Sequence, residues 1–176
     1  ALYTQTTGGT DNVAIGRYSQ YYAATATYNV SVGNNSLTNS SSGDFNVAVG
    51  HEALNDNTTG NQNVAVGTYA LDANTTADNN TAIGYNSLTA NTTGTSNTAV
   101  GAYTLTSVTT GDQNTAVGRG ALSDNTGTSN TAVGYNALTS NTTASGLTAV
   151  GRRALELNTT GSNNTAVGSS ALDANT

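Results

Sequence analysis

Apolar and polar residues alternate along this chain in a pattern that returns at every seventeenth position. The segment Val/Thr-Ala-Val/Ile-Gly occurs once per unit, and only Ser31 replaces its alanine. The glycines that end the segment are Gly16, Gly33, Gly50, Gly67, Gly84, Gly101, Gly118, Gly134, Gly151 and Gly168. The step from Gly118 to Gly134 is one position shorter, because the usual turn Asn-Thr-Thr-Gly is reduced there to Asn125-Thr126-Gly127. Residues 1–176 are therefore expected to form a single repeat domain.

Each unit contains two kinds of segment that favour strands. In Asn-Thr-Ala-Val-Gly, β-branched residues alternate with alanine, which is typical of a short strand. The segment x-Ala-Leu-x predicts a second short strand, and the stretches between the two are rich in turn-forming residues. Two short strands per unit predict an all-β fold, a β-solenoid (β-roll) of about ten 17-residue coils.

Stacking of the coils would place equivalent residues directly above one another. Leucine forms one such column, from Leu37 to Leu172, and asparagine forms another, from Asn12 to Asn164, interrupted only by Leu147. Asparagine amides stacked in this way hydrogen-bond along the axis of cross-β assemblies. We therefore expect coil-to-coil hydrogen bonds to give rigidity to a chain with few apolar residues.

Alternation within the strand predicts which side chains point out of the coil. A coil of 17 residues has a narrow interior, in which alanine and glycine fit opposite leucine. The Val/Ile column lies on the other face of the strand and would therefore point outwards. In the alternative arrangement, valine and leucine share the interior of a monomer and alanine lies outside. An exposed apolar column predicts a partner, and three copies that meet on an axis would bury it, so we expect a homotrimer. The column consists of Ile15, Val32, Val49, Val66, Ile83, Val100, Val117, Val133, Val150 and Val167.

Composition excludes several classes of function. The chain has no cysteine and one histidine, so disulfides, thiolate chemistry and a histidine metal cluster are excluded, and we expect no cofactor and no metal. The net charge of −6, without any lysine, argues against a nucleic-acid partner. No apolar run approaches the ~20 residues of a membrane span.

The two ends also carry expectations. The chain opens at Ala1 without Met, which we interpret as a mature product or an excised piece of a longer fibre. It begins and stops inside a unit, and an open coil exposes unpaired backbone groups. Either more chain follows at both ends, or copies stack end to end.

The units Val13-Ala14-Ile15-Gly16 and Asn130-Thr-Ala-Val-Gly-Tyr-Asn-Ala-Leu138, with Asn141-Thr-Thr, resemble repeats of two related groups of proteins. One group is the heads of YadA-like trimeric autotransporter adhesins, and the other is the repeat regions of phage tail fibres and bacterial "tail fiber domain" surface proteins. The resemblance implies a trimeric left-handed β-roll, an extracellular location at the cell surface or on a virion, and a structural or adhesive role. The 17-residue unit is longer than the repeat of the adhesin heads.

No residues are expected to be catalytic. Carboxylates recur in the turn before the strand, at Asp11, Asp44, Asp78 and Asp112. They lie two coils apart, roughly 10 Å, which is too far for an acid pair or a shared small ion and fits solvated turn carboxylates. The pairs His51-Glu52 and Arg152-Arg153 are isolated on the coil surface. The chain also lacks the Gly-x-Asp nonapeptide of calcium-binding rolls.

The turn Asn-Thr-Thr raises two further hypotheses. It matches the N-glycosylation acceptor pattern at Asn57, Asn74, Asn91, Asn141 and Asn158. The alternative, which we favour, is that Asn and Thr simply suit a tight turn. The same turns would present a regular array of hydroxyls, similar to that of ice-binding solenoids, at Thr58, Thr75, Thr92, Thr109, Thr142 and Thr159.

The second unit is the least regular one. Gln20 stands where leucine is expected, and tyrosines gather around it at Tyr18, Tyr21, Tyr22 and Tyr28. Clustered tyrosines stack on sugars or pack against a partner, which makes a cell-surface glycan a candidate ligand. The alternative is an irregular cap at the end of the leucine column, as repeat proteins require.

These observations predict an extracellular structural fibre or filament segment that acts as a rigid spacer and is not an enzyme. The alternative is an adhesin-like, receptor-binding module with a tyrosine-rich contact surface. An ice-binding solenoid is a distant third hypothesis.

Overall fold

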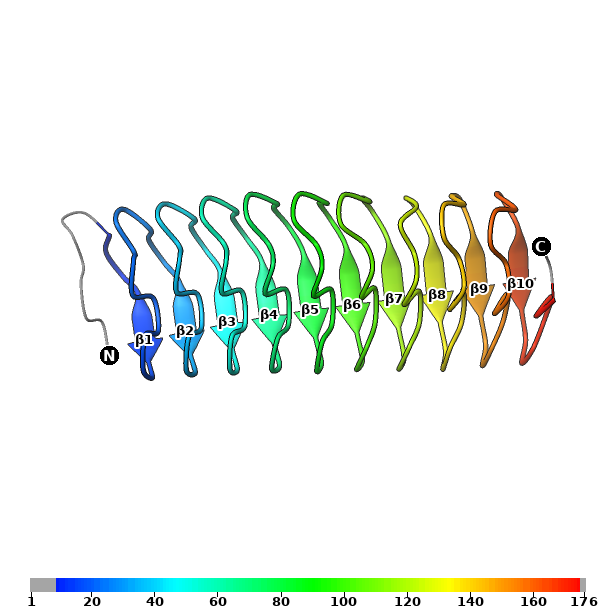
Figure 1. Cartoon of the computed structure of the whole chain (residues 1–176), viewed down its shortest axis with the longest axis horizontal. Helices are drawn as coiled ribbons and strands as arrows, with labels where there is room; N and C mark the ends of the chain where they lie inside the picture. The colour runs from blue at the N-terminus through cyan, green and yellow to red at the C-terminus, as the bar shows by residue number, and fades with distance from the viewer. Residues whose placement is uncertain (1–8, 175–176) are drawn as a thin grey trace.

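The fold is a straight rod of stacked coils, seen in a computed structural model that describes residues 9–174 (Figure 1). The expectations about the two chain ends concern residues outside this range. Each coil contributes one three-residue strand, and the strands are β1 (Val13–Ile15), β2 (Val30–Val32), β3 (Val47–Val49), β4 (Val64–Val66), β5 (Thr81–Ile83), β6 (Thr98–Val100), β7 (Thr115–Val117), β8 (Thr131–Val133), β9 (Thr148–Val150) and β10 (Thr165–Val167). The predicted all-β solenoid of 17-residue coils is confirmed.

The strands form a single parallel sheet in the order of the sequence, from β1 to β10. Pairing follows the repeat, so that Val64 pairs with Thr81 at the same position of the next coil, and the shortened unit pairs Thr115 with Thr131. The missing residue comes from an exposed turn, because Asn125 and Gly127 both remain buried in their columns. The columns therefore continue unbroken through the shorter coil.

The expected second strand of each coil is wrong, because the Ala-Leu segment is a turn. Leu88 has a φ of 54° and Asn86, two residues earlier, has a φ of 51°, both in the left-handed region that a strand does not visit. This conformation costs an L-residue about 1–2 kcal/mol. Burial of the whole Leu88 side chain and a 2.9 Å hydrogen bond from its N–H to the carbonyl of Thr104 offset that cost. Leucines with positive φ recur at Leu37, Leu54, Leu71, Leu88, Leu105, Leu122, Leu138, Leu155 and Leu172.

The interior of the rod is built from alanine and leucine, as expected. In β7, Ala116 is fully buried while Val117 is 37% exposed. The outward direction of the Val/Ile column is thus confirmed, and the alternative with valine and leucine together inside is wrong. The alanines of the strands pack with the leucines of the turns in one buried core.

The asparagine column is confirmed and hydrogen-bonds mainly to the backbone. The backbone N–H of Asn46 donates to Oδ1 of Asn29 in the preceding coil at 2.7 Å. Nδ2 of Asn46 donates to the carbonyl of Gly60 at 2.9 Å. At Leu147 the N–H still donates to Oδ1 of Asn130, at 3.0 Å, although leucine brings no amide of its own.

Candidate functional site

The proposed glycosylation sites lie inside the rod. Asn57, Asn74, Asn91, Asn141 and Asn158 are all fully buried. Nδ2 of Asn74, for example, donates to Oδ1 of Asn57 at 2.8 Å and to the carbonyl of Ala77 at 3.2 Å. An N-linked glycan needs an exposed amide nitrogen, so this second asparagine column is structural and the glycosylation hypothesis is wrong for the folded chain.

The threonine hydroxyls of the same turns point along the rod and bind the next coil. Oγ1 of Thr58 donates to the carbonyl of Thr75 at 2.9 Å, and Oγ1 of Thr75 donates to the carbonyl of Thr92 at 3.1 Å. The pattern repeats from Thr142 to Thr159 at 3.1 Å. These hydroxyls hold adjacent turns together.

The turn carboxylates also bind backbone groups of a neighbouring coil. Oδ1 of Asp44 accepts the backbone N–H of Thr27 at 2.7 Å, and Oδ1 of Asp112 accepts that of Thr95 at 2.6 Å. Asp78 has the same role for Asn61, whereas Asp11 lies one position further along and accepts a hydrogen bond from Oγ1 of Thr10 at 3.0 Å. Residues 9–174 contain no group of three or more His, Cys, Asp or Glu side chains that would hold a metal ion.

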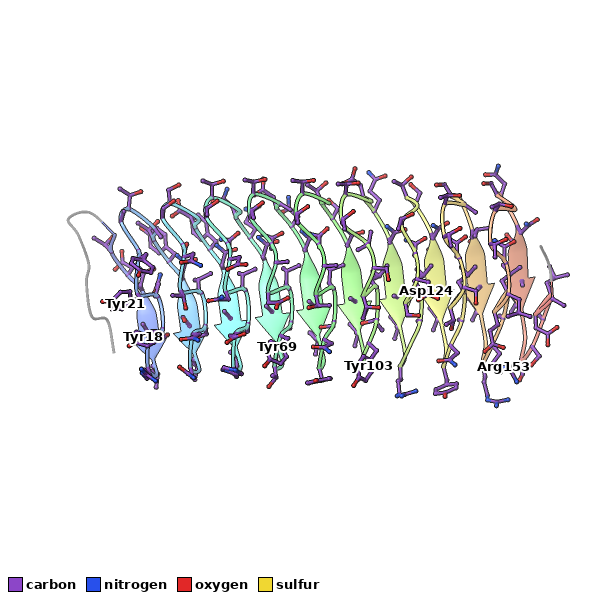
Figure 2. The ribbon with its side chains drawn as sticks, viewed as in Figure 1. Tyr18, Tyr21, Tyr69, Tyr103, Asp124 and Arg153 are labelled. Carbon is purple, nitrogen blue, oxygen red and sulfur yellow. The ribbon has the colours of Figure 1, made fainter. Side chains whose placement is uncertain are left out.

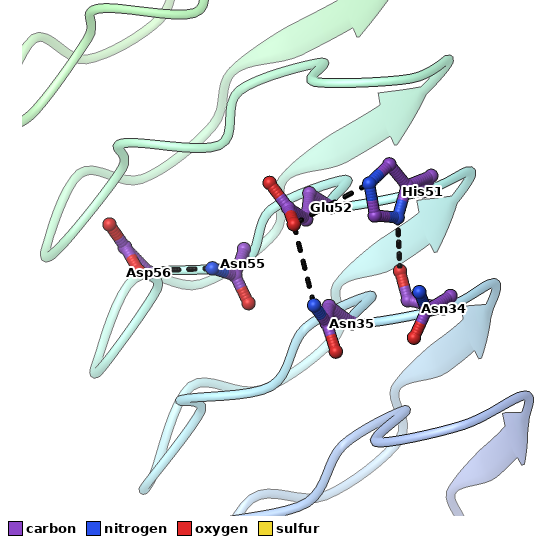
Figure 3. Close-up of polar contacts among 6 residues, drawn as sticks. All are labelled: Asn34, Asn35, His51, Glu52, Asn55 and Asp56. Carbon is purple, nitrogen blue, oxygen red and sulfur yellow. Dashed lines mark hydrogen bonds and ion pairs between the residues drawn. The ribbon is translucent and has the colours of Figure 1, made fainter.

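His51 and Glu52 form a small polar cluster with the preceding coil (Figure 3). Nε2 of His51 lies 3.5 Å from Oε1 of Glu52, and Nδ1 of His51 lies 3.2 Å from the carbonyl of Asn34. Nδ2 of Asn35 donates to Oε1 of Glu52 at 3.4 Å. Both side chains therefore contact neighbouring groups of their own rod.

Three of the four candidate tyrosines come together at the N-terminal end of the rod. The ring centroids of Tyr18 and Tyr21 are 5.2 Å apart, and those of Tyr21 and Tyr22 are 4.7 Å apart, both with the rings edge to face. These three tyrosines, which we call the tyrosine cluster, line a cavity of about 350 Å³. The rest of its lining is polar and comes from the next two coils: Asn35, Thr38, Asn39 and Asn55.

Tyr28 does not belong to the tyrosine cluster. It lies in the turn before β2 and stacks on Phe45, with ring centroids 5.0 Å apart and an angle of 6° between the ring planes. The core beneath this end is more polar than elsewhere, because Ser19, Ser31 and Ser36 hydrogen-bond to one another inside it. Gln20 is fully buried in the leucine column, and its side-chain amide has no hydrogen-bond partner among residues 9–174.

The Val/Ile column forms a continuous apolar strip on the outer face of the sheet. From β2 to β10 its residues alternate with buried side chains, which are alanines in every strand except β2, where Ser31 is buried. In the middle of the rod, for example, Ile83 is 39% exposed and Val150, further along, is 37% exposed. The repeat therefore creates a regular apolar surface along the sheet.

Sequence reasoning missed one regular surface of the rod. The two positions that follow the repeat glycine, from Arg17-Tyr18 in the first coil to Ser169-Ser170 in the last, form one long edge, which we call the post-glycine edge. Figure 2 shows Tyr18, Tyr69, Tyr103 and Arg153 along it. All four arginines and the only histidine of the chain lie in these positions: Arg17, His51, Arg119, Arg152 and Arg153.

Acidic residues are nearly absent from the same edge. Glu52 is the only one of the ten acidic residues of the chain that lies there. Arg152 and Arg153 belong to this edge and are therefore not an isolated pair, and Arg153 also forms an ion pair with Glu156 of its own coil. An alignment of the units position by position would have shown that the basic residues share two columns.

No helix within the described residues is long and apolar enough to cross a membrane. Comparison of the chain with protein-family models, with curated proteins and with solved structures gives no match. The chain is a parallel β-solenoid built from 17-residue coils, and its resemblance to adhesin heads and tail fibres stays a prediction from its sequence.

Proposed function

We propose that this chain is a segment of an extracellular fibre, in which it acts as a rigid spacer and has no catalytic role. Support comes from the straight stack of coils, in which strands, asparagines, threonines and aspartates all bind the neighbouring coil. Hydrogen bonds between successive coils along the whole axis make the rod resist bending. The resemblance to adhesin heads and tail fibres agrees with a location outside the cell.

The exposed Val/Ile strip is the observation that carries the proposal. The interior of each coil is filled by its own alanine, leucine and asparagine side chains, so the strip has no role within one chain. An uninterrupted apolar strip on a flat sheet marks an association surface. Three rods that meet along this strip would bury it on a common axis, and the partner is therefore a second and third copy of the same chain.

Negative-stain microscopy combined with mass measurement of the native protein tests this assembly. We expect slender rods with the mass of three chains. Val117→Asp places a charge on the strip and should yield single rods, because an unpaired charge is costly to bury on the axis. Gln113→Asp is the matched control, since Gln113 is exposed in the turn before the same strand. A native mass of one chain, or an unchanged mass in Val117→Asp, would contradict the proposal.

The tyrosine cluster supports a second candidate function, that of an adhesive, receptor-binding module. Its aromatic rings and the surrounding amides line one cavity, a combination typical of surfaces that bind sugars or polar peptides. The double variant Tyr21→Ala/Tyr22→Ala should then abolish attachment to target cells while the length and mass of the rod stay unchanged. Attachment at the original level in this variant would exclude the cluster as the contact surface.

A further inference from the structure

The aromatic and basic side chains of the post-glycine edge touch one another in an unbroken series. Ring centroids are 5.5 Å apart between His51 and Tyr69, 6.3 Å between Tyr69 and Tyr85, and 5.3 Å between Tyr85 and Tyr103. The guanidinium of Arg119 continues the series, since it lies 5.7 Å from the ring centroid of Tyr103 and 5.8 Å from that of Tyr135. The series therefore runs from the third coil to the eighth.

These side chains stand on a rigid base and remain open to solvent. The backbone N–H of Tyr103 donates to the carbonyl of Tyr85 at 3.0 Å, and the same bond links Tyr69 to His51. Tyr85, Tyr103 and Tyr135 are nevertheless 45%, 42% and 44% exposed. A ligand that lies along the edge thus meets rings already in place, which lowers the entropy lost on binding.

We propose that the post-glycine edge binds an extended acidic heteropolysaccharide, whose sugar rings lie along the tyrosines and whose carboxylates pair with the arginines. A linear, regularly spaced row of aromatic rings fits a polymer with a regular repeat. Arginine binds carboxylates in a forked, two-bond geometry. Because the rest of the rod is acidic, an anionic polymer would be steered to this edge alone.

The spacing of the positive charges distinguishes a polysaccharide from a nucleic acid. Arginines occur in the first, seventh and ninth coils, so the charges of successive arginine-bearing coils are six and two coils apart. Those separations correspond to about 29 and 10 Å along the rod. A nucleic acid carries a phosphate at every nucleotide and needs a dense basic stripe. Sparse charges suit a polymer with one acidic sugar in each repeating unit.

Affinity electrophoresis tests the proposal on the whole chain. The protein is run in native gels that contain hyaluronan or deacylated gellan, and in gels that contain the same polymers after their carboxyl groups have been reduced. We expect retardation by at least one acidic polymer, weaker retardation at high salt, and none by its reduced form. Oligothymidylate serves as the nucleic-acid probe and should bind more weakly.

Two pairs of variants locate the binding surface. Tyr103→Asn and Arg119→Gln should each weaken binding about tenfold. Asparagine already occupies the position of Tyr103 in other coils, at Asn86 and Asn136, so the fold is expected to tolerate it. The controls are Phe45→Gln, which removes an exposed ring at a position where Gln62 stands in the next coil, and Gln62→Glu, which changes the net charge as Arg119→Gln does.

The electrophoresis results either support or overturn the polysaccharide proposal. Retardation that is lost in Tyr103→Asn and Arg119→Gln, and kept in both controls, supports the proposal. The proposal would be overturned if neither acidic polymer retarded the protein, or if the reduced polymers bound equally well. It would also be overturned if the controls lost binding to the same extent, or if oligothymidylate bound more tightly. A changed native mass in Tyr103→Asn would also overturn it, because the edge would then be a contact between copies. The native mass of the unmodified protein tests the fibre assembly separately, so the two proposals fail independently.

Discussion

The backbone N–H of Asn97 donates a 2.9 Å hydrogen bond to Oδ1 of Asn80, one coil earlier in the rod. Nδ2 of Asn80 also donates to the carbonyl of Gly94 at 2.9 Å. One fully buried side chain therefore satisfies a backbone donor and a backbone acceptor of the following coil. Repeated along the rod, this relationship replaces much of the cohesion that a larger apolar core would supply.

Replacement of Asn80 by alanine tests the strength of this relationship. Asn80→Ala leaves the buried N–H of Asn97 without its partner, which costs about 1–3 kcal/mol, whereas the carbonyl of Gly94 still accepts from Nδ2 of Asn91 at 2.9 Å. We expect a lower free energy of unfolding in urea and faster hydrogen exchange at the Asn97 amide. Ser96→Ala, at an exposed position of the adjacent turn, is the control and should change neither quantity. Unchanged exchange at Asn97 in Asn80→Ala would contradict the assigned role.

The glycine column explains why the repeat keeps a glycine after every strand. Gly84 has a φ of 139°, and a Cβ placed on it would lie 2.6 Å from the carbonyl carbon of Gly101. Gly84→Ala combines backbone strain with a clash against the next coil, so we expect it to lower the free energy of unfolding by about 3 kcal/mol or more. Thermal unfolding followed by circular dichroism measures the loss.

Gly120 provides a control in another column. Its φ is 70°, and asparagines with positive φ occupy the same position in other coils, at Asn86 and Asn136. A Cβ on Gly120 would meet only the end of the Asn136 side chain, which can turn away, whereas a Cβ on Gly84 would meet backbone. Gly120→Asn should therefore leave the melting temperature nearly unchanged. Equal effects of Gly84→Ala and Gly120→Asn would mean that close contact between stacked glycines does not set the requirement.

The sequence predicted those parts of the fold that follow from side-chain period and size. The 17-residue repeat determined the stacking, and the alternation of Ala116 with Val117 determined which one is buried. The Ala-Leu turn was not predicted, because leucine in the left-handed region goes against its intrinsic preference and is stabilised only by the neighbouring coils. Contacts between coils determine that backbone conformation, and the sequence pattern within one unit gives no information about them.

The candidate sites also divide into features that follow from the local sequence and features that depend on contacts between coils. The motif at Asn57 is the same whether the turn faces outwards or inwards, so the glycosylation pattern alone could not reveal that Asn57 is buried. The gathering of Tyr18 with Tyr21 follows from adjacency in the chain, whereas the stacking of Tyr28 on Phe45 depends on the 17-residue offset between coils. The post-glycine edge was visible in principle, but only after the units had been aligned in columns.

Asp72 makes the stability of the rod depend on pH. Partial burial raises the pKa of its carboxyl above the usual value of 3.8, and the nearby Asp56 carboxylate raises this pKa further, against hydrogen bonds from the Thr89 hydroxyl and the Ala73 backbone. The unfolded chain therefore loses this proton at a lower pH than the folded chain does. Stability is unaffected below the unfolded pKa, falls as the pH rises from there through the folded pKa, and stays lower at neutral pH.

Asp72→Asn should remove this loss, since asparagine keeps an oxygen to accept the 2.6 Å hydrogen bond from Oγ1 of Thr89. We expect the variant to be more stable than the unmodified protein at neutral pH and equally stable below the unfolded pKa. Urea denaturation across the acidic range measures both. Asp124→Asn removes the same charge at an exposed position and controls for net charge. A variant less stable than the unmodified protein at neutral pH would contradict the prediction.

Removal of one whole coil should shorten the rod and leave its structure intact. Deletion of residues 85–101 joins Gly84 to Ala102 and keeps every asparagine, leucine and glycine in its column, because each coil bonds only to its two neighbours. We expect a folded rod with one strand fewer, about 4.8 Å shorter, which small-angle scattering and circular dichroism measure. Deletion of residues 85–93 joins Gly84 to Gly94 and moves the columns out of line, so this variant should aggregate or unfold. If both deletions give the same result, the register between coils does not determine the fold.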